Sequence, residues 1–198
     1  MPLRAQKLIS PCLAVFVLCI FGSSLASAGP LSEAAAKAEA MQSSGDPAGA
    51  YELMREAVSD FSATLPFSIG KAVFVTEPPL GYGIYTPRAN SDFKASEPLI
   101  SYIEPLGLTW KAVDQSGKQQ TKFTVDFDIL DEAGDVLAGQ KAFGSFSFTG
   151  LFRNQELFTH LKLDVSSAPP GKYTLRYTFN DTNSGKSAVI DLPFVIMP

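Results

Sequence analysis

Two different periods of hydrophobic residues divide the chain near residue 65. In the segment 47–65 apolar residues recur every three or four positions, which is typical of a helix with one buried face. From residue 69 onward apolar and polar residues alternate, which is typical of strands that turn one face to a core. The helical stripe consists of Ala50, Leu53, Met54, Ala57, Val58, Phe61 and Leu65.

The residues 31–63 predict a hairpin of two helices. They are rich in Ala and Glu and contain no run of β-branched residues. Ser32 is expected to cap the first helix and Gly45 to end it, while Asp46 caps the second helix and Pro47 fits its first turn. An apolar stripe needs a surface to pack on, so we expect this hairpin to pack on the rest of the chain or to dock on a partner.

The residues after 65 predict a β structure. Between the alternating runs lie turn sequences such as "DEAGD" and "APPGK". Seven to nine short strands without intervening helices predict an antiparallel sandwich or barrel, with the polar face of each strand in solvent. The clear strand candidates are 123–129, 157–165, 172–179 and 188–196, and the weaker ones are 71–76, 99–104 and 108–113.

These patterns predict a mainly β protein with a small α part, in which a helical hairpin precedes an antiparallel β-sandwich. The predicted parts are an export signal over 1–28, the hairpin over 29–65, a Pro/Gly/Tyr-rich connector over 66–92, and the β-sandwich over 93–198, with 71–76 as an alternative first strand of the sandwich.

The first 28 residues have the pattern of a cleavable signal peptide. Arg4 and Lys7 precede an apolar run over 8–21, and small residues lead up to Ala28. Cleavage after Ala28 predicts a periplasmic or secreted protein. The alternatives are an uncleaved anchor, for which the run is short, and a lipid anchor at Cys19.

Composition after the predicted cleavage excludes several classes of chemistry. Cys12 and Cys19 both lie in the signal, so the mature chain has neither a disulfide nor a thiol nucleophile. The remaining 14 basic and 20 acidic residues give a net charge of −6. This acidic balance argues against a nucleic-acid partner and against an anionic membrane surface.

Two segments carry resemblances to known folds. In "PPGKYTLRYTF", Tyr173 follows a Pro-Gly turn at the start of a strand and Leu175 stands two residues later. With "FKASEPLISYIEP" as an early strand, the segment Phe93–Ile196 resembles the Ig-like and fibronectin-III-like modules of exported bacterial proteins. The resemblance implies that Tyr173 hydrogen-bonds back to the preceding corner, that Leu175 points into the core, and that Trp110 is the core tryptophan.

The hairpin itself resembles a single tetratricopeptide-type unit. This resemblance covers about thirty residues, with Gly45-Asp46 at the turn. One such unit cannot bury its own apolar face. Neither resemblance implies an activity.

Catalytic chemistry has few candidate residues. His160 is the one histidine and is expected on the wet face of its strand, without the serine and carboxylate of a hydrolase or the further ligands of a zinc site. Asp126 and Asp128 share a strand face at about 7 Å, near the separation that glycoside hydrolases use. A solvated strand face is the simpler interpretation of this pair.

The acidic turn at 131–135 is a second candidate for chemistry. Asp131, Glu132 and Asp135 offer carboxylates for Ca²⁺, but their spacing does not match the EF-hand loop. We therefore predict no cofactor, no resident metal and no enzymatic activity.

Two aromatic stretches are candidates for binding a partner. "PPLGYGIYTPR" holds Tyr82, Tyr85 and Arg88 on a semi-rigid backbone and is interpreted either as a connector whose tyrosines pack on the sandwich or as a binding loop. In "FGSFSFTGLF", Phe146 and Phe148 share a face and belong either to the core or to an apolar patch for another chain.

The predicted function is the binding of another protein in the periplasm or cell envelope, with Tyr82, Tyr85, Arg88, Phe146 and Phe148 as candidate contact residues. The alternative is a carbohydrate-binding module that uses exposed aromatic side chains such as Tyr82, Tyr85 or Phe158, with or without help from Ca²⁺. A glycoside hydrolase that uses Asp126 and Asp128 is the remote alternative.

Overall fold

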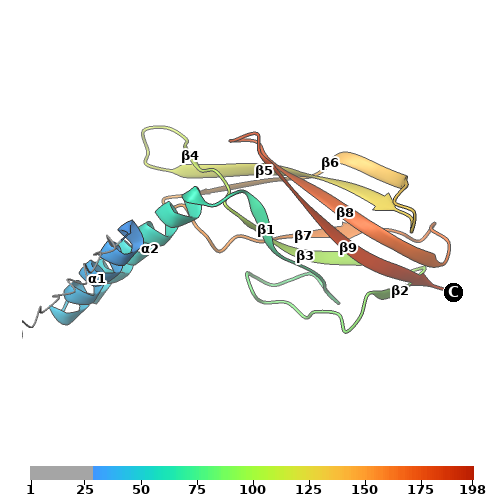
Figure 1. Ribbon diagram of the computed structural model, residues 1–198, viewed down its shortest axis with the longest axis horizontal. Coiled ribbons are helices and arrows are strands. Elements are labelled where there is room, and N and C mark those ends of the chain that lie inside the picture. Colours follow the sequence, from blue (N-terminus) through green and yellow to red (C-terminus); the bar gives the residue numbers. More distant parts are fainter. Residues whose placement is uncertain (1–28) are drawn as a thin grey trace, which may run out of the picture.

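The computed structural model describes residues 29–198, so the predicted export signal, with Cys12, Cys19 and the cleavage site at Ala28, lies outside the described residues. Within the described range, two helices precede nine strands and the protein is mainly β (Figure 1). The helices are α1 (Pro30–Ser43) and α2 (Pro47–Thr64), and the strands are β1 (Ser68–Phe74), β2 (Asp92–Lys94), β3 (Leu99–Leu106), β4 (Lys111–Ala112), β5 (Gln119–Leu130), β6 (Val136–Gly150), β7 (Thr159–Leu163), β8 (Gly171–Asp181) and β9 (Ser187–Met197).

The turn between the helices is built as the sequence predicts. Gly45 adopts a φ of 90°, a left-handed conformation that favours glycine. The Asp46 carboxylate accepts a hydrogen bond from the Gly49 amide at 2.9 Å, and Pro47 occupies the first turn of α2. The predicted Ser32 cap is wrong, because α1 begins at Pro30 and makes no side-chain cap bond.

The strands form two sheets. A small sheet has the order β1-β3-β7, and a larger sheet has the order β2-β9-β8-β5-β4, with β6 also paired to β5. Neighbouring strands run antiparallel except for the short β2, which pairs in parallel with β9 over Asp92–Lys94. The prediction of antiparallel pairing is therefore wrong at this edge, where the chain enters the large sheet after a long loop instead of a hairpin.

One hydrophobic cluster joins the two sheets. Phe74 and Ile103 reach it from the small sheet, and Phe123, Leu175 and Phe179 reach it from the large sheet. Aromatic rings meet between the sheets, as in the pair Phe74 of β1 and Phe194 of β9, with centroids 6.3 Å apart. The alternation read from the sequence thus identifies the inner faces of β5, β7, β8 and β9 correctly.

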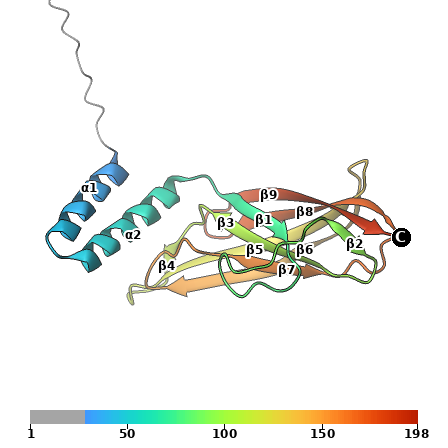
Figure 2. The same ribbon diagram turned by 90° about the horizontal axis from the view of Figure 1, so that it is seen from below.

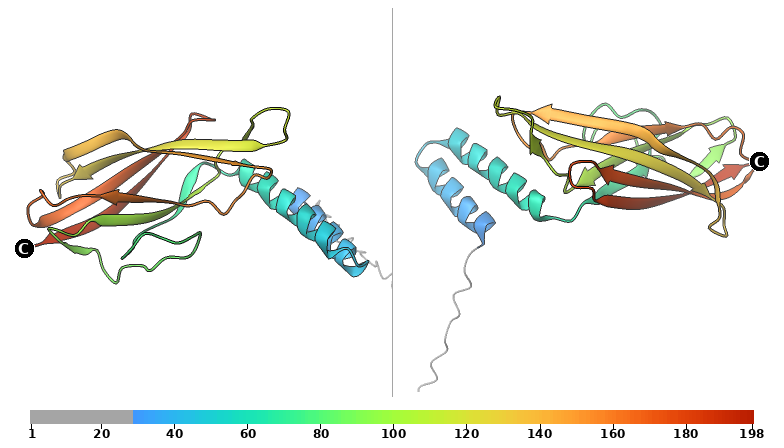
Figure 3. Two further views of the ribbon diagram at one scale, coloured as in Figure 1. Left: turned by 180° about the vertical axis from the view of Figure 1, so that it is seen from behind. Right: turned by 90° about the horizontal axis from the view of Figure 1, so that it is seen from above.

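The helical hairpin projects from one end of this two-layer body, and the C-terminus lies at the other end (Figures 1 and 2). Its two helices run antiparallel beside each other, and the last turns of α2 lie nearest to the sheets (Figure 3). Neither of the helices in residues 29–198 has the length and apolar character that crossing a bilayer requires.

Tyr173 makes the backward hydrogen bond expected of it. Its hydroxyl donates to the Pro169 carbonyl at 2.8 Å, and Leu175 is fully buried. We predict that Tyr173→Phe lowers the free energy of unfolding by about 1 kcal/mol, because one buried hydrogen bond is lost without a change of shape. For a chain of this size that corresponds to about 3 °C in Tm, measurable by calorimetry.

The matched control for this substitution is Tyr51→Phe. Tyr51 is 69% exposed and its hydroxyl makes no hydrogen bond within the described residues. An equal loss of stability in both variants would contradict a role for the Tyr173 corner bond.

Candidate functional site

The main candidate site is an open cleft between α2 and the β body, which we call the hairpin cleft. It has a volume of about 640 Å³. Its floor and walls are mostly apolar, and its rim is polar, which is the usual character of a binding site. The residues that line it include Tyr51, Met54, Arg55 and Val58 of α2, Trp110, Phe148, and the segment 149–157 that connects β6 to β7.

A stacked pair crosses the hairpin cleft and joins the hairpin to the β body. The Arg55 guanidinium carbon lies 3.2 Å from the centre of the Phe152 ring. Arg55 is also ion-paired with Glu52 on the same helix. Phe152 lines the cleft and is nevertheless 55% exposed, so about half of its surface remains accessible to a ligand.

Polar contacts complete the joint near the end of α2. Ser59 is buried and its hydroxyl donates to the Arg153 carbonyl at 3.3 Å. The Gln155 amide donates to the same carbonyl at 2.7 Å, and Arg153 pairs with Asp60 at 2.5 Å. The hairpin is thus held by a few side chains of one loop and not by an extensive interface.

Trp110 is held at the cleft by a network of polar groups at the β8–β9 turn. The Asp181 carboxylate accepts from the Thr109 amide at 2.9 Å, and the Asn183 side chain donates to the Thr109 carbonyl at 2.9 Å. Trp110 is half-buried, packing on one side against the core. The prediction that it is the core tryptophan is therefore only partly right, because it also lines the cleft.

Asp181 is almost completely buried, which is unusual for a carboxylate. Burial alone would raise its pKa, but hydrogen bonds from the Ser184 hydroxyl and from the amides of Thr109 and Asn183 outweigh that effect. The pKa of Asp181 is therefore below its ordinary value of 3.8. Asp181 remains charged at neutral pH and fixes the segment that carries Trp110.

The segment 76–88, which we call the tyrosine loop, folds over the outer face of the small sheet. Tyr85 stacks on Tyr102 of β3, with centroids 4.0 Å apart, and Tyr102 stacks in turn on Phe158 at 5.5 Å. The Lys71 ammonium lies 5.8 Å from the Tyr85 ring. The tyrosine loop is thus a cover for this sheet, which agrees with the connector interpretation as far as Tyr85 is concerned.

Hydrogen bonds at Tyr102 fix the backbone of the tyrosine loop. The Tyr102 hydroxyl accepts from the Gly83 amide at 2.8 Å and donates to Glu104 at 2.7 Å. Burial raises the pKa of Tyr102, and Glu104 raises it further. Tyr82 beside them is 38% exposed, and burial followed by Glu104 raises its pKa as well. Leu80 at the loop tip is 89% exposed.

The other candidate contact residues, Arg88, Phe146 and Phe148, all contact side chains of the β body. Arg88 pairs with Glu97, lies 4.1 Å over the Phe93 ring and donates to the Asp92 carbonyl, so it fastens β2. Phe146 stacks on Phe123 at 5.1 Å and belongs to the core side of β6. Phe148 lies beside it and also lines the hairpin cleft. The structure therefore separates the tyrosine loop from Phe148 and brings Phe148 together with Trp110.

The expectation that Asp126 lies on a wet strand face is wrong. It is buried, and its carboxylate accepts from the Ala142 amide at 2.8 Å and pairs with Lys141 at 3.2 Å. Ala142 has a φ of 49° and lies where β6 bulges over β5. Burial would raise the pKa of Asp126, but these bonds and one from Asn180 lower it overall.

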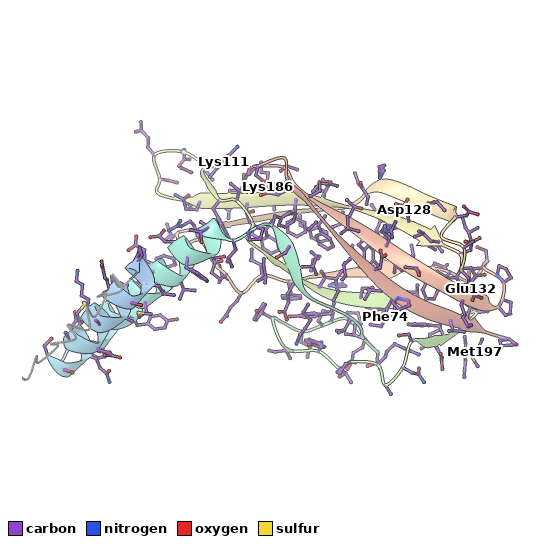
Figure 4. The ribbon with its side chains drawn as sticks, in the orientation of Figure 1. Phe74, Lys111, Asp128, Glu132, Lys186 and Met197 are labelled. Atoms are coloured by element: carbon purple, nitrogen blue, oxygen red, sulfur yellow. The ribbon has the colours of Figure 1, made fainter. Side chains whose placement is uncertain are left out.

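Asp128 does not reach the hairpin cleft. It lies on the part of the large sheet away from the hairpin, whereas Lys111 and Lys186 lie at the hairpin end (Figure 4). Of the two acids of the remote glycoside hydrolase alternative, Asp126 is thus bound to the β6 bulge, and Asp128 lies far from the hairpin cleft.

Other ionisable candidates are dispersed over the described residues. His160 lies exposed on β7, on the face that alternates with the buried Leu161. Asp131 accepts from the amides of Ala133 and Asp135 and so shapes its own turn. Within residues 29–198 no three acidic, histidine or cysteine side chains gather as a metal site would require.

Sequence reasoning missed the joint between Arg55 and Phe152. Phe152 has the same parity along the sequence as Phe146 and Phe148, but β6 ends at Gly150 and Phe152 lies in the following loop. The sequence signal for this joint is Arg55, because it places a cation next to Met54, a residue of the apolar stripe of α2.

Comparisons with known proteins leave the family of this chain open. No family model matches it, and no curated protein matches it. A solved structure from work on glycolipid glycan hydrolysis, a family 123 glycoside hydrolase from Clostridium perfringens, is similar over 64% of this chain with 14% identity and a TM-score of 0.39. This chain covers 27% of that protein. Similarity at this level carries no inference about function.

We predict that Asp181→Asn lowers the free energy of unfolding by about 2 kcal/mol, because an amide replaces a charged acceptor of several hydrogen bonds. A group with a depressed pKa stabilises the fold above its ordinary value of 3.8 and ceases to do so as the pH falls through the folded-state pKa. The stability difference between wild type and variant should therefore be constant near neutrality and shrink below about pH 4.

The measurement is urea unfolding at several pH values, with Asp92→Asn as the control. Asp92 is exposed and its carboxylate makes no hydrogen bond among the described residues. If the control loses as much stability, or if the difference persists at pH 2, the role given to Asp181 is wrong.

We also predict that Phe152→Ala loosens the hairpin without unfolding the β body. Phe152 joins the two parts but lies outside the core. The emission of Trp110, the one tryptophan of the chain, should shift to longer wavelength, while Tm falls by no more than about 3 °C. Val136→Ala, at a 61% exposed position of β6 that does not line the cleft, is the control and should leave the emission unchanged.

Proposed function

We propose that this chain is an exported, non-catalytic protein that binds another protein of the cell envelope through the hairpin cleft. The observation that supports this most directly is the concentration of exposed apolar and aromatic side chains at that cleft. Tyr51, Val58, Leu151 and Phe152 are all more than 40% exposed there and lie around Trp110.

Such a grouping fits the binding of a protein segment. Tryptophan, tyrosine and arginine dominate the energy of protein interfaces, particularly where neighbouring contacts exclude water. Met54 adds an adaptable apolar surface, and Asn154 and Glu156 offer hydrogen-bond partners at the rim. An open cleft suits an extended segment or a protruding side chain of a partner.

The export and the fold type belong to the same proposal. The pattern of residues 1–28 supports export to the periplasm or outside the cell. The corner bond of Tyr173 and the burial of Leu175 support an Ig-like assignment of the β body, a fold that commonly serves as a binding scaffold.

Catalysis has weaker support than binding. The Asp126 carboxylate is used by the β6 bulge, and His160 lies exposed on β7 without a hydrogen bond to a serine or an acid in the described part of the chain. The basic groups at the cleft, Arg55 and Arg153, already pair with Glu52 and Asp60.

A photo-crosslinking amino acid placed at Phe152 tests the proposal in intact cells of the native host. We expect an adduct with a discrete envelope protein, and we expect Val58→Glu to weaken that adduct at least fivefold because a charge enters the apolar wall of the cleft. The control is the same crosslinker at Thr182, an exposed position outside the cleft. The same adduct from both positions, or none from Phe152, contradicts the proposal.

Carbohydrate binding in the same cleft is a second candidate. Aromatic Trp110 and Phe152 lie there beside the side chains of Asn154 and Gln155, whereas the tyrosine loop has one ring face of Tyr85 covered. Titration of the purified chain with oligosaccharides, followed by Trp110 emission, separates the two: a saturable change with a sugar and no protein adduct at Phe152 favours the carbohydrate.

A further inference from the structure

A second concave surface lies on the hairpin, on a different side of α2 from the hairpin cleft. We call it the helix groove. It has a volume of about 600 Å³ and lies between the start of α1 and the last three turns of α2. Its apolar lining is Leu31, Ala34, Leu53, Ala57 and Phe61.

The helix groove has the form that a third helix requires. Leu53, Ala57 and Phe61 follow one another at intervals of four residues and so form a ridge along α2. Ala57 is small at the centre of that ridge, which lets another backbone approach to the usual 8–10 Å between helix axes. From Leu53 to Thr64 the groove runs for about 17 Å, which corresponds to about three turns.

This surface lacks a partner within residues 29–198. Phe61 is 48% exposed and Leu31 is 37% exposed. Of the hairpin residues only Ala38, Ala50 and Ser59 are buried, so α1 and α2 cover little of their apolar surface against each other. Isolated helices of this length are marginal in water, and packing of an apolar face is what stabilises them.

Charge indicates what covers the helix groove. Residues 30–64 carry six acidic side chains and two basic ones, a net charge of −4. Glu56 and Asp60 line the groove, and Glu56 has no ion pair in the described part of the chain. Two copies of the same acidic hairpin would repel each other, whereas a basic helix would be attracted.

We propose that the helix groove binds a basic amphipathic helix of a partner protein, which lies on the hairpin as its third helix. This inference goes beyond the proposed function, because it assigns a second binding surface on the other side of α2 from the hairpin cleft. Leucine-like side chains of that helix would cover Leu53, Ala57 and Phe61, and its lysine or arginine side chains would face Glu56 and Asp60.

The probe is a labelled synthetic 18-residue helix with leucine at intervals of three and four and lysine elsewhere. Binding to the purified chain 29–198 is followed by fluorescence anisotropy of the label. We expect saturable binding that weakens as salt rises. A peptide with glutamate in place of every lysine, and one with the same residues interrupted by two prolines, should each bind at least tenfold more weakly.

Substitutions in the chain test whether the peptide binds in the helix groove. Phe61→Ser should weaken binding about tenfold, because a half-exposed aromatic anchor is lost from the groove. Tyr51→Ser is the matched control, because Tyr51 is more exposed and lies on the hairpin cleft side of α2. Its effect should be less than twofold.

A matched pair of substitutions measures how much the charge of the groove contributes to peptide binding. Glu56→Gln should weaken binding about threefold at low salt, while Glu39→Gln, which removes the same charge from α1 outside the groove, should change it by less than twofold. Glu56→Lys should weaken binding of the lysine peptide further than Glu56→Gln does and reduce its advantage over the glutamate peptide, since Asp60 still lines the groove. Circular dichroism of each variant checks that the hairpin remains helical.

Three results would overturn the inference: equal binding of the lysine and glutamate peptides, equal losses from the groove and control substitutions, or a concentration-dependent dimer in sedimentation that Phe61→Ser abolishes. The last would assign the groove to a second copy. None of them removes the proposed function, because crosslinking at Phe152 reports on the other side of α2.

Discussion

Two antiparallel helices have more apolar surface than they can bury against each other, and this constraint shapes the hairpin end of the molecule. In α2 the apolar stripe is wide enough to face α1, the β body and solvent at once. Small residues, Ala38 and Ala50, fill the contact between the helices, so the larger side chains point elsewhere. The exposed surfaces on both sides of α2 follow directly from that arrangement.

The β body can hold such a hairpin because its own stability does not depend on it. The inner faces of both sheets meet in one cluster of aromatic and aliphatic side chains, and the hairpin contributes nothing to that cluster except through the loop that follows α2. Asp181 and Asn183 then fix Trp110 at the hairpin end with polar contacts. Rigid positioning of Trp110 and weak attachment of α2 therefore coexist at the same cleft.

The fold could be predicted from the sequence wherever one local pattern decides the outcome. Alternation identified the strands around Phe123 and Leu175, the Asp46-Pro47 pair marked the start of α2, and Tyr173 was correctly expected to bond back to its corner. Each of these features depends on residues that are close in sequence, so a local pattern is enough to predict them.

The candidate site could not be predicted in the same way, because it depends on contacts between distant segments. The bulge at Ala142 covers Asp126, and no pattern within the sequence of β5 indicates that Asp126 is buried. Arg55 and Phe152 are almost a hundred residues apart, and Phe152 leaves the strand pattern where β6 ends. Composition alone leaves two interpretations of the tyrosine loop open, because the conformation of the loop depends on the hydrogen bond from the Gly83 amide to Tyr102 of the later strand β3.

Asp60 connects the two surfaces of α2. It lines the helix groove and also pairs with Arg153, whose carbonyl and side chain hold the joint at the hairpin cleft. A cation that approaches Asp60 from the groove competes with Arg153 for the same carboxylate, since an exposed ion pair is worth less than about 1 kcal/mol and is exchanged easily. Release of Arg153 would leave its guanidinium available in the hairpin cleft. If the groove binds a basic helix as proposed, attraction at one surface would weaken a contact at the other, and Asp60 would couple occupation of the groove to the hairpin cleft.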